Sequence, residues 1–346
     1  MGIDFLSRIS SRKDNKILIF IGIGIAILVG FKTYQSFWNK VAINEYYADT
    51  ADTTEKKATL TDKPPPYDQN KEETSNSIHS LSTSTGTPDG SNLKLLCWNL
   101  DGLDRKDLEE RTAAVVENIL LKKPDVVMLQ EVVAYSLKVF QENCEGYIVL
   151  PGNYTFPYFN AILVRTSTVL TKASSLQSVG FETSKMGRYY LIQPIKFAEA
   201  KIIVMTSHFE SLSEHGAERK KQFSEILDYM KRQSENFNVI FGGDTNLRDA
   251  ELNAVGGLSG GVLDAWESCG SALTSKYTWN MAENDNMDKK YQKPPKLRFD
   301  RIFVRPAKGP KAIKPISFTL VGKERLKGCK RFASDHWGVW LEFGIH

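Results

Sequence analysis

The chain has 346 residues, of which 41% are hydrophobic and 25% are charged, and its formal net charge at pH 7 is +4. This balance is typical of a globular protein with a large core, and the mild positive charge allows a polyanionic partner without requiring one. The spacing of the four cysteines, Cys97, Cys144, Cys269 and Cys329, argues against a zinc site and against a disulfide framework, which favours a reducing compartment.

The first region, residues 1–40, contains an uncharged apolar run over residues 17–31 with basic residues on both sides. A helix of this length would span about 22 Å, short of the roughly 30 Å hydrocarbon core of a bilayer, but the flanking Lys16 and Lys32 can reach the head groups. We interpret the run as a short membrane anchor. The alternatives are a cleaved signal peptide, for which no A-x-A site follows the run, and a buried core helix, for which no folded segment is adjacent.

The orientation of this anchor stays open. More basic residues precede the run than follow it, so the positive-inside rule would keep the N-terminus in the cytosol and translocate the remainder of the chain. Insertion of the kind found in the mitochondrial outer membrane would instead leave the bulk of the chain in the cytosol.

The second region, residues 41–92, is rich in Thr, Ser, Asp, Lys and Pro and has very few large apolar side chains. Such a segment cannot bury enough surface to offset its chain entropy, which predicts a disordered linker. Within it, Pro64–Tyr67 fits the PPxY motif that WW domains bind. The alternative is a solvated spacer without a partner.

The third region, residues 93–346, alternates apolar strand patterns with helical patterns. Helices are predicted at 107–122 and 214–233, and the second has one apolar face formed by Phe223, Ile226, Leu227 and Met230. Strands are predicted at 93–99, 125–131, 160–165, 189–197, 201–208, 239–241, 298–304, 317–321 and 339–343. Many strands with a few helices indicate an α/β domain in which two sheets pack together and helices lie outside.

Polar side chains border five of these strands, where a turn needs only Gly, Asn or Ser. They are Asn99 and Asp101, Glu131, the group His208, Glu210 and Ser211, the group Asp244, Asn246, Arg248 and Asp249, and the pair Asp335 and His336. The fourth group follows Gly242 and Gly243, which let the backbone approach a neighbour closely. Any one group could be an ordinary polar turn, but chance is a poor account of all five. We therefore predict one site at the sheet edge where these strands end.

Glu131 and Asp101 offer hard oxygen ligands, which favours Mg²⁺ or Mn²⁺ bound together with water and a substrate phosphate. Such an ion polarises a phosphoryl oxygen and stabilises a leaving oxyanion.

The remaining site residues suit hydrolysis of a phosphodiester. Asp244 with Asn246 can orient an attacking water, while His336 and His208 can donate hydrogen bonds to phosphoryl oxygens as charge develops there. Either Asp335 or Asp300 could hold an imidazole in the correct tautomer.

Seven stretches carry a family resemblance: Trp98–Asp104, Thr206–Ser211, Ala217–Arg219, Gly243–Asp249, Tyr277–Trp279, Lys296–Phe303 and Ser334–Gly338. Together they resemble the endonuclease/exonuclease/phosphatase superfamily of metal-dependent phosphodiesterases, and within it the members that act on tyrosyl–DNA bonds. They occur in the family's order over residues 93–343, nearly all of the third region.

The resemblance implies a four-layered α/β/β/α sandwich of two packed mixed sheets with outer helices. It implies hydrolysis of 5′-phosphotyrosyl bonds between DNA and trapped adducts of the topoisomerase II type, leaving a 5′-phosphate, in DNA repair in the nucleus. Glu131 and Asp101 would bind Mg²⁺, with Mn²⁺ tolerated. Asp244 would activate water and His336 would stabilise the transition state.

The resemblance also implies further site residues. Asn99, His208, Asn246 and Asp335 would complete the catalytic set. Contacts with the DNA 5′ end would come from Asn99, Asp101, Gly102, Leu103, Tyr158, His208, Phe209, Glu210, Ser211, Asn246, Leu247, Arg248, Trp279, Phe299 and His336. Stacking of aromatic side chains on bases is plausible chemically, because it needs no sequence reading, and ordinary strand packing is the alternative for each aromatic.

The N-terminus departs from the family pattern, because an apolar run and a linker stand where a ubiquitin-associated domain is expected. A single-pass membrane-anchored protein with the catalytic domain facing the cytosol is therefore the alternative to a nuclear one. Two alternative functions follow: a phosphodiesterase of the same superfamily acting on lipid or inositol phosphates, and a catalytically idle, tethered ligand of WW domains. Against the first stand Asn246–Asp249, Trp279 and Phe299, and against the second stands a complete set of acids and histidines.

Overall fold

The computed structural model describes residues 92–154, 157–287 and 291–346. The predicted anchor at 17–31, the PPxY motif at 64–67 and all but the last residue of the predicted linker lie outside these ranges, so they stay predictions. Among the residues that the structure describes, no helix is both long and apolar enough to cross a bilayer.

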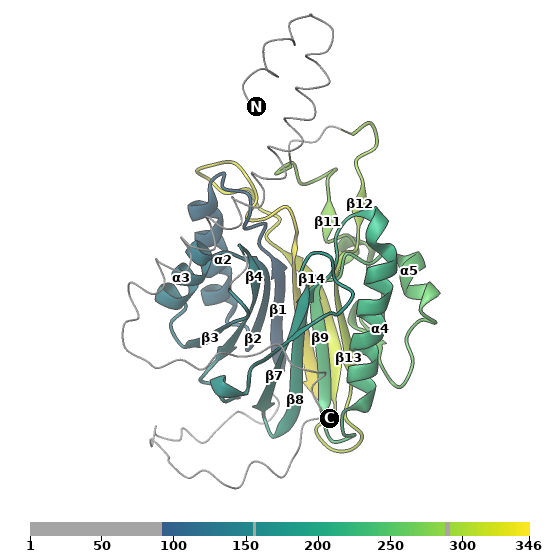
Figure 1. Cartoon of the computed structure of the whole chain (residues 1–346). Helices are drawn as coiled ribbons and strands as arrows, with labels where there is room; N and C mark the ends of the chain where they lie inside the picture. The colour runs from purple at the N-terminus through teal and green to yellow at the C-terminus, as the bar shows by residue number, and fades with distance from the viewer. Residues whose placement is uncertain (1–91, 155–156, 288–290) are drawn as a thin grey trace, which may run out of the picture. The chain divides into compact units, whose positions relative to one another are not determined.

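The first of two large sheets combines strands from both ends of the described chain. Its strands lie in the order β14 (Ile313–Val321), β15 (Gly338–Ile345), β1 (Leu93–Asn99), β2 (Val126–Val132), β4 (Phe159–Arg165) and β3 (Tyr147–Pro151). Only β1 and β2 pair in parallel, and α2 (Leu108–Lys122) connects them. A second helix, α3 (Ala134–Asn143), follows β2, and both helices lie on the outer side of this sheet (Figure 1).

The second large sheet has the order β10 (Leu263–Asp264), β13 (Asp300–Arg305), β9 (Asn238–Asp244), β8 (Ala200–His208), β7 (Tyr189–Phe197) and β5 (Val169–Leu170), and β6 (Gln177–Gly180) also pairs with β7. Only β8 and β9 pair in parallel, and α4 (Gly216–Arg232) connects them. The smaller elements are α5 (Asp249–Ala254), α6 (Ala265–Ser268), the ribbon of β11 (Trp279–Asn280) and β12 (Lys296–Leu297), and the 3₁₀ turns η2 (Ala173–Ser175), η3 (Ser213–His215) and η4 (Leu273–Ser275).

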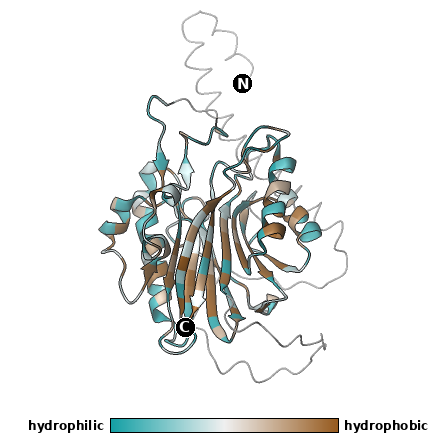
Figure 2. Cartoon of the chain, turned by 180° about the vertical axis from the view of Figure 1, so that it is seen from behind, coloured by the Kyte–Doolittle hydropathy of each residue, from teal (hydrophilic) through white to brown (hydrophobic). Residues whose placement is uncertain are grey.

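Alternation along the strands divides the core into layers. In β8, Ile202 and Val204 join the cluster between the two sheets, while Ile203 and Met205 join a second cluster with the apolar face of α4. Because successive strand residues point to opposite faces, each sheet buries both sides. Figure 2 shows hydrophobic residues concentrated along the central strands. The predicted α/β/β/α sandwich is confirmed, as is every predicted strand and both predicted helices. The elements that were not predicted are α3, β3, β6 and the short α5, α6, β5, β10, β11 and β12.

The two glycines at the end of β9 bring the sheets and strands close together. A Cβ at Gly242 would lie 2.6 Å from the methyl carbon of Met128 in the other sheet. A Cβ at Gly243, where φ is +155°, would lie 2.0 Å from the carbonyl oxygen of Ser207. Glycine is therefore required there, and it allows Asp244 to sit beside His208 and opposite Asp300 on the neighbouring strands.

A buried arginine stands at the fourth position of each crossover helix. Arg111 of α2 donates to the carbonyl oxygens of Leu100 and Asp101 at 3.1 Å each, just after β1. Arg219 of α4 binds the loop after β8 in the same way. Each crossover unit therefore fixes the loop that leaves the carboxyl end of its first strand.

Candidate active site

The polar strand ends meet at one edge of the two packed sheets. Asn99 ends β1 and Glu131 lies near the end of β2, while His208 and Asp244 end β8 and β9. Asp300 begins β13, the antiparallel neighbour of β9, and His336 lies just before β15. The carboxyl ends of the parallel pairs and the amino ends of their antiparallel neighbours thus converge, as the sequence predicted.

Asn99 connects the two sides of this edge. Its Nδ2 donates to Glu131 Oε1 at 3.2 Å and to Asp244 Oδ2 at 3.0 Å, and its Oδ1 accepts from the backbone N–H of Asp101 at 3.0 Å. The residue is 1% exposed. One amide therefore sets the spacing between the carboxylates of the two sheets.

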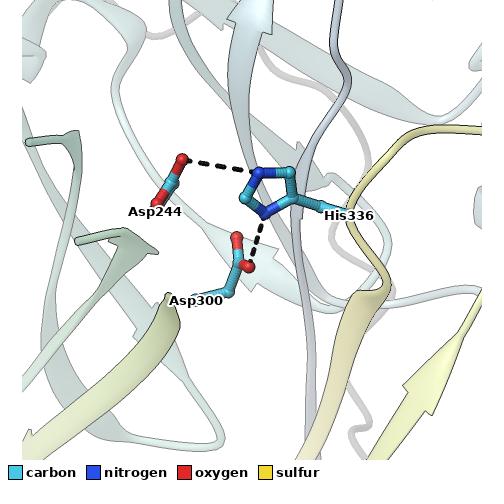
Figure 3. A group of neighbouring side chains, drawn as sticks. All are labelled: Asp244, Asp300 and His336. Carbon is cyan, nitrogen blue, oxygen red and sulfur yellow. Dashed lines mark hydrogen bonds and ion pairs between the residues drawn. The ribbon is translucent and has the colours of Figure 1, made fainter. Parts of the chain in front are cut away.

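His336 is held between two aspartates (Figure 3). Its Nδ1 lies 2.7 Å from Asp300 Oδ2, and its Nε2 lies 3.8 Å from Asp244 Oδ2. Burial alone would lower the pKa of His336, but the negative charges around it, that of Asp300 foremost, raise this pKa well above its ordinary value. The imidazole is therefore a positively charged hydrogen-bond donor whose Nε2 points toward Asp244.

His208 and Asp244 form a contrasting pair. Burial lowers the pKa of His208 well below its ordinary value, and the charges of Arg188 and His336 lower it further. Burial raises the pKa of Asp244 to about 6, although the His336 charge opposes the rise. His208 Nε2 lies 3.2 Å from Asp244 Oδ2, so a neutral imidazole can donate to this carboxylate. The two histidines therefore hold different charges within one site.

Three carboxylates gather on the other side of Asn99. Burial raises the pKa of Asp101 to about 8 and that of Glu131 to about 7, and repulsion from Asp335 adds to both shifts. Asp101 and Glu131 also have φ values of 49° and 53°, a left-handed conformation that is strained for Glu. Partly buried oxygen ligands that repel one another fit a divalent cation, because its charge would relieve both the burial cost and the repulsion.

A second group of metal-ligand atoms comes from Asp244, Asp300 and His336, which lie within 4.8 Å of one another. His336 already binds Asp300 there and carries positive charge, which opposes a cation. The Asp101 and Glu131 side therefore fits a metal better.

Two buried side-chain nitrogens at this edge have no hydrogen-bond partner among the residues that the structure describes. They are Asn246 Nδ2 and His208 Nδ1. An unpaired buried polar atom is costly unless a ligand satisfies it. Asn246 Nδ2 can donate to an anionic group, which suits an oxygen of a phosphate, whereas Nδ1 of the neutral His208 is an acceptor, because this ring donates through Nε2.

Aromatic and basic side chains border the site. Tyr158 lies 6.1 Å from the His208 ring, and the Arg188 guanidinium lies 5.3 Å from the Tyr158 ring. On the His336 side, Trp279 and Phe299 lie 5.5 Å apart between ring centroids. The aromatic rings of this border can stack on planar groups, and the Arg188 guanidinium can bind a negatively charged group.

Residues 96–336 match the model of the Endonuclease/Exonuclease/phosphatase family. The chain belongs to this family. It is 40% identical to tyrosyl-DNA phosphodiesterase 2 of Gallus gallus over 255 residues, 74% of this chain and 68% of that protein. It is 37% identical to the Homo sapiens protein of the same name over 310 residues, 88% of this chain and 84% of that protein.

A solved structure described as D. rerio TDP2 complexed with single-strand DNA product superposes on 73% of this chain and 99% of that chain, with a TM-score of 0.70 and 38% identity. Within the endonuclease/exonuclease/phosphatase family, the chain therefore groups with tyrosyl-DNA phosphodiesterase 2. Members of this family are metal-dependent phosphodiesterases, which agrees with the fit of Asp101 and Glu131 to a divalent cation.

Most site residues predicted from the sequence lie together at this edge. Some of the predicted DNA contacts do not reach it with their side chains. Phe209 and Leu247 belong to the core cluster with α4. The Glu210 carboxylate is fully buried and accepts hydrogen bonds from Ser184, Gln222 and two backbone N–H groups. These side chains point inward from the loops that follow β8 and β9, so contact with DNA from these positions would come from the backbone.

Gly102 and Leu103 lie in the loop after β1. A Cβ at Gly102 would lie 2.1 Å from the carbonyl oxygen of Glu131, so this position is a close backbone approach. Leu103 is 48% exposed and is therefore free to touch a ligand.

The sequence left open whether Asp335 or Asp300 orients His336. In the structure Asp300 binds the imidazole, whereas Asp335 Oδ2 accepts from Trp279 Nε1 at 3.1 Å and Asp335 Oδ1 lies 3.9 Å from Nε2 of the imidazole. Asp300 faces Asp244 across a strand pair, which only the register reveals. Arg188 was missed because it lies just before β7 without a polar cluster of its own.

The pKa shifts predict a displaced pH profile. Asp244 must be ionised to take a proton, so kcat/KM should be retained above pH about 6 and fall below it, not below the ordinary Asp value of about 4. His336 must be protonated, so activity should persist well above the ordinary His value of about 6.5 before it declines. The measurement is kcat/KM at saturating metal from pH about 5 to about 10. A kcat/KM that stays constant down to pH about 4 and falls only below it would contradict the role of Asp244.

Proposed function

We propose that this protein hydrolyses the phosphodiester bond between a protein tyrosine and the 5′-phosphate of DNA and so leaves a 5′-phosphate during DNA repair. The observation that carries the proposal is the hydrogen-bonded set in which Asn99 joins Glu131 to Asp244 beside a charged His336. Support for the substrate comes from relatives named tyrosyl-DNA phosphodiesterase 2 and from the relative solved with single-strand DNA product. Adducts of the topoisomerase II type are the substrate that we propose in the cell.

In this mechanism Glu131 and Asp101 would hold Mg²⁺, with Mn²⁺ tolerated, and the bound ion would neutralise charge at the phosphate and at the leaving oxygen. Asp244 accepts the proton of a water whose oxygen forms the new bond to phosphorus. The bond from phosphorus to the tyrosine oxygen breaks, and the phenolate leaves with the electron pair. His336 donates to a non-bridging oxygen, where negative charge grows in the transition state.

Asn246 Nδ2 supplies a further donor to the phosphate, because it has no hydrogen-bond partner among the described residues. The neutral His208 donates through Nε2 to Asp244 and so helps to hold this carboxylate in place. Asp300 keeps the His336 imidazole oriented and charged through the 2.7 Å contact at Nδ1. These residues cost no reorganisation at the moment of reaction, since their neighbours already hold them.

The test is an assay of the full chain with a 5′-phosphotyrosyl oligonucleotide and Mg²⁺. We expect free tyrosine and a 5′-phosphorylated oligonucleotide, and no cleavage when EDTA replaces the metal. Sphingomyelin and inositol phosphates serve as competing substrates. Cleavage of these with no cleavage of the oligonucleotide would reject the proposed substrate in favour of the lipid or inositol phosphate alternative.

Replacement of Trp279 should weaken binding of the oligonucleotide. Trp279 is partly exposed and lies over the buried Phe299, a position suited to stacking on a base. Trp279→Leu should raise KM for the oligonucleotide by about 5- to 150-fold, because base stacking contributes about 1–3 kcal/mol. Hydrolysis of a small chromogenic phosphodiester should change much less.

The matched control for that measurement is Trp340→Leu. Trp340 is also partly exposed but lies in β15, where its Nε1 donates to Glu342. Its loss should leave KM unchanged for both substrates. Equal losses on the oligonucleotide and on the small substrate in Trp279→Leu would assign this aromatic a structural role.

For location we propose the nucleus, which the relatives and the substrate favour. Single-pass anchoring through residues 17–31 with the catalytic domain facing the cytosol is the alternative, and a WW partner at Pro64–Tyr67 belongs to the same hypothesis. Recovery of the full chain in the carbonate-resistant membrane fraction would favour the anchor. Recovery in the soluble nuclear fraction would reject it.

A further inference from the structure

Arg219, in the Ala217–Arg219 stretch, binds two loops at once from a fully buried position in the first turn of α4. Its Nη1 donates to the carbonyl oxygens of Glu210 at 3.0 Å, Ser211 at 3.3 Å and Leu212 at 2.5 Å. These are three consecutive residues of the loop after β8. The guanidinium therefore holds the backbone of this loop rather than one side chain.

The other edge of the guanidinium is used for Glu251. Nε and Nη2 of Arg219 donate to the two oxygens of this carboxylate at 2.9 and 2.7 Å. Glu251 in turn accepts from the backbone N–H of Arg248 at 3.1 Å, at the start of α5. Arg219 and Glu251 thus connect the loop after β8 with the loop after β9.

The loop after β8 needs this restraint. Leu212 has φ 66° and ψ 154°, a conformation that is costly for a residue with a side chain, and it is 55% exposed. The Leu212 side chain is too exposed to hold this backbone in place through packing. The hydrogen bond from Arg219 to the Leu212 carbonyl oxygen restrains it instead.

Each of the two connected loops carries residues that face the proposed DNA end. Ser211 Oγ accepts from Arg188 Nη2 at 3.1 Å in the first loop. In the second loop Arg248 Nη1 donates to the Asn246 carbonyl oxygen at 2.6 Å, and its guanidinium lies 5.2 Å from the Phe299 ring. The spacing between these groups therefore depends on the connection beneath them.

We propose that Arg219 is a positioning residue that sets the distance between Ser211 and Arg248, and through it the affinity for the 5′ end of the DNA. This inference rests on the proposed function for its substrate. Arginine is required because one planar group must make two parallel bonds to Glu251 and still reach three carbonyl oxygens, whereas a lysine offers a single point charge.

A second buried arginine provides a matched control. Arg305 Nη2 donates to the carbonyl oxygens of Gln233, Ser234 and Phe237 at 3.2, 3.0 and 3.3 Å. These carbonyls follow the last turn of α4, while Arg219 lies in its first turn. Removal of either arginine leaves three backbone acceptors without a buried guanidinium, but only Arg219 lies beneath the site.

The experiment compares Arg219→Met with Arg305→Met in the full chain. Arg219→Met should raise KM for the 5′-phosphotyrosyl oligonucleotide by about tenfold or more relative to Arg305→Met, because a misplacement of about 1 Å is costly. The value of kcat and the hydrolysis of a small chromogenic phosphodiester should change by less than about threefold, because Asp244, His336 and Glu131 lie on strand ends. Equal changes of KM in both variants would overturn the inference.

Amide hydrogen exchange without substrate separates this inference from the proposed function. Arg219→Met should speed exchange at residues 210–213 and 246–251 only, and Arg305→Met at residues 233–238 only. Faster exchange spread over the whole fold in Arg219→Met would overturn the inference even if the wild-type chain cleaves the oligonucleotide. If the wild-type chain does not cleave it, the proposed function fails while the exchange result still tests the positioning role.

Two milder variants apply if Arg219→Met does not fold. Arg219→Lys keeps the charge and loses the paired bonds to Glu251, and Glu251→Gln keeps the shape and loses the carboxylate. Both should raise KM with little change of kcat. Normal KM in both variants would overturn the inference.

Discussion

Asp244→Asn should lower kcat by roughly 10²–10⁴-fold, the range typical for loss of a general base. The amide keeps the size of the side chain but cannot take a proton from water. KM should hold or fall, because a carboxylate facing a phosphodiester repels it and the amide does not. The measurement is a single-turnover rate together with the Kd of the oligonucleotide on one preparation.

The structure adds a reason to measure stability alongside. Asp244 Oδ2 faces two donors, Asn99 Nδ2 at 3.0 Å and His208 Nε2 at 3.2 Å, so an amide N–H₂ there would meet donors instead of accepting from them. Rates must therefore be expressed per folded molecule. Asp125→Asn is the control, because buried Asp125 accepts from Lys94 and Thr168 at the opposite end of β2. It should lower Tm and keep kcat.

Glu131→Gln should lower kcat/KM by about 10²–10³-fold at fixed metal, since a metal ion contributes several kcal/mol to transition-state stabilisation. It should also abolish the rise of Tm that added Mg²⁺ or Mn²⁺ causes in the wild-type chain. The second readout needs no turnover, so it separates loss of metal binding from loss of chemistry.

The control for this variant is Glu110→Gln. Glu110 accepts from the backbone N–H groups of Gly328 and Cys329 and takes no part in the proposed site. Its replacement should leave the metal-induced rise of Tm intact. A wild-type response to metal in Glu131→Gln would reject Glu131 as a ligand.

Local patterns determined much of the architecture before any tertiary contact was considered. Continuous apolar runs predicted the central strands of both sheets, because strands buried on both faces need apolar residues at every position. The stripe of Phe223, Ile226, Leu227 and Met230 predicted the face of α4 that packs on the second sheet. Helix α3 was not predicted, because only three of its ten residues, Ser136, Leu137 and Phe140, are buried.

The sequence by itself also determined which residues gather at the site, because strand ends that carry acids, amides and imidazoles stand out against ordinary turns. Only the tertiary structure decided their roles toward one another. It assigned Asp300 rather than Asp335 to His336, through the register of β13 against β9. It also turned Phe209 and Glu210 inward.

The charges of the two histidines are the clearest case of this division. His208 and His336 are chemically identical in the sequence. Burial beside Arg188 keeps His208 neutral, whereas the facing carboxylate of Asp300 keeps His336 protonated. A pKa depends on charges and solvent within a few ångströms, and residues from separate strands supply both only after the sheets have packed.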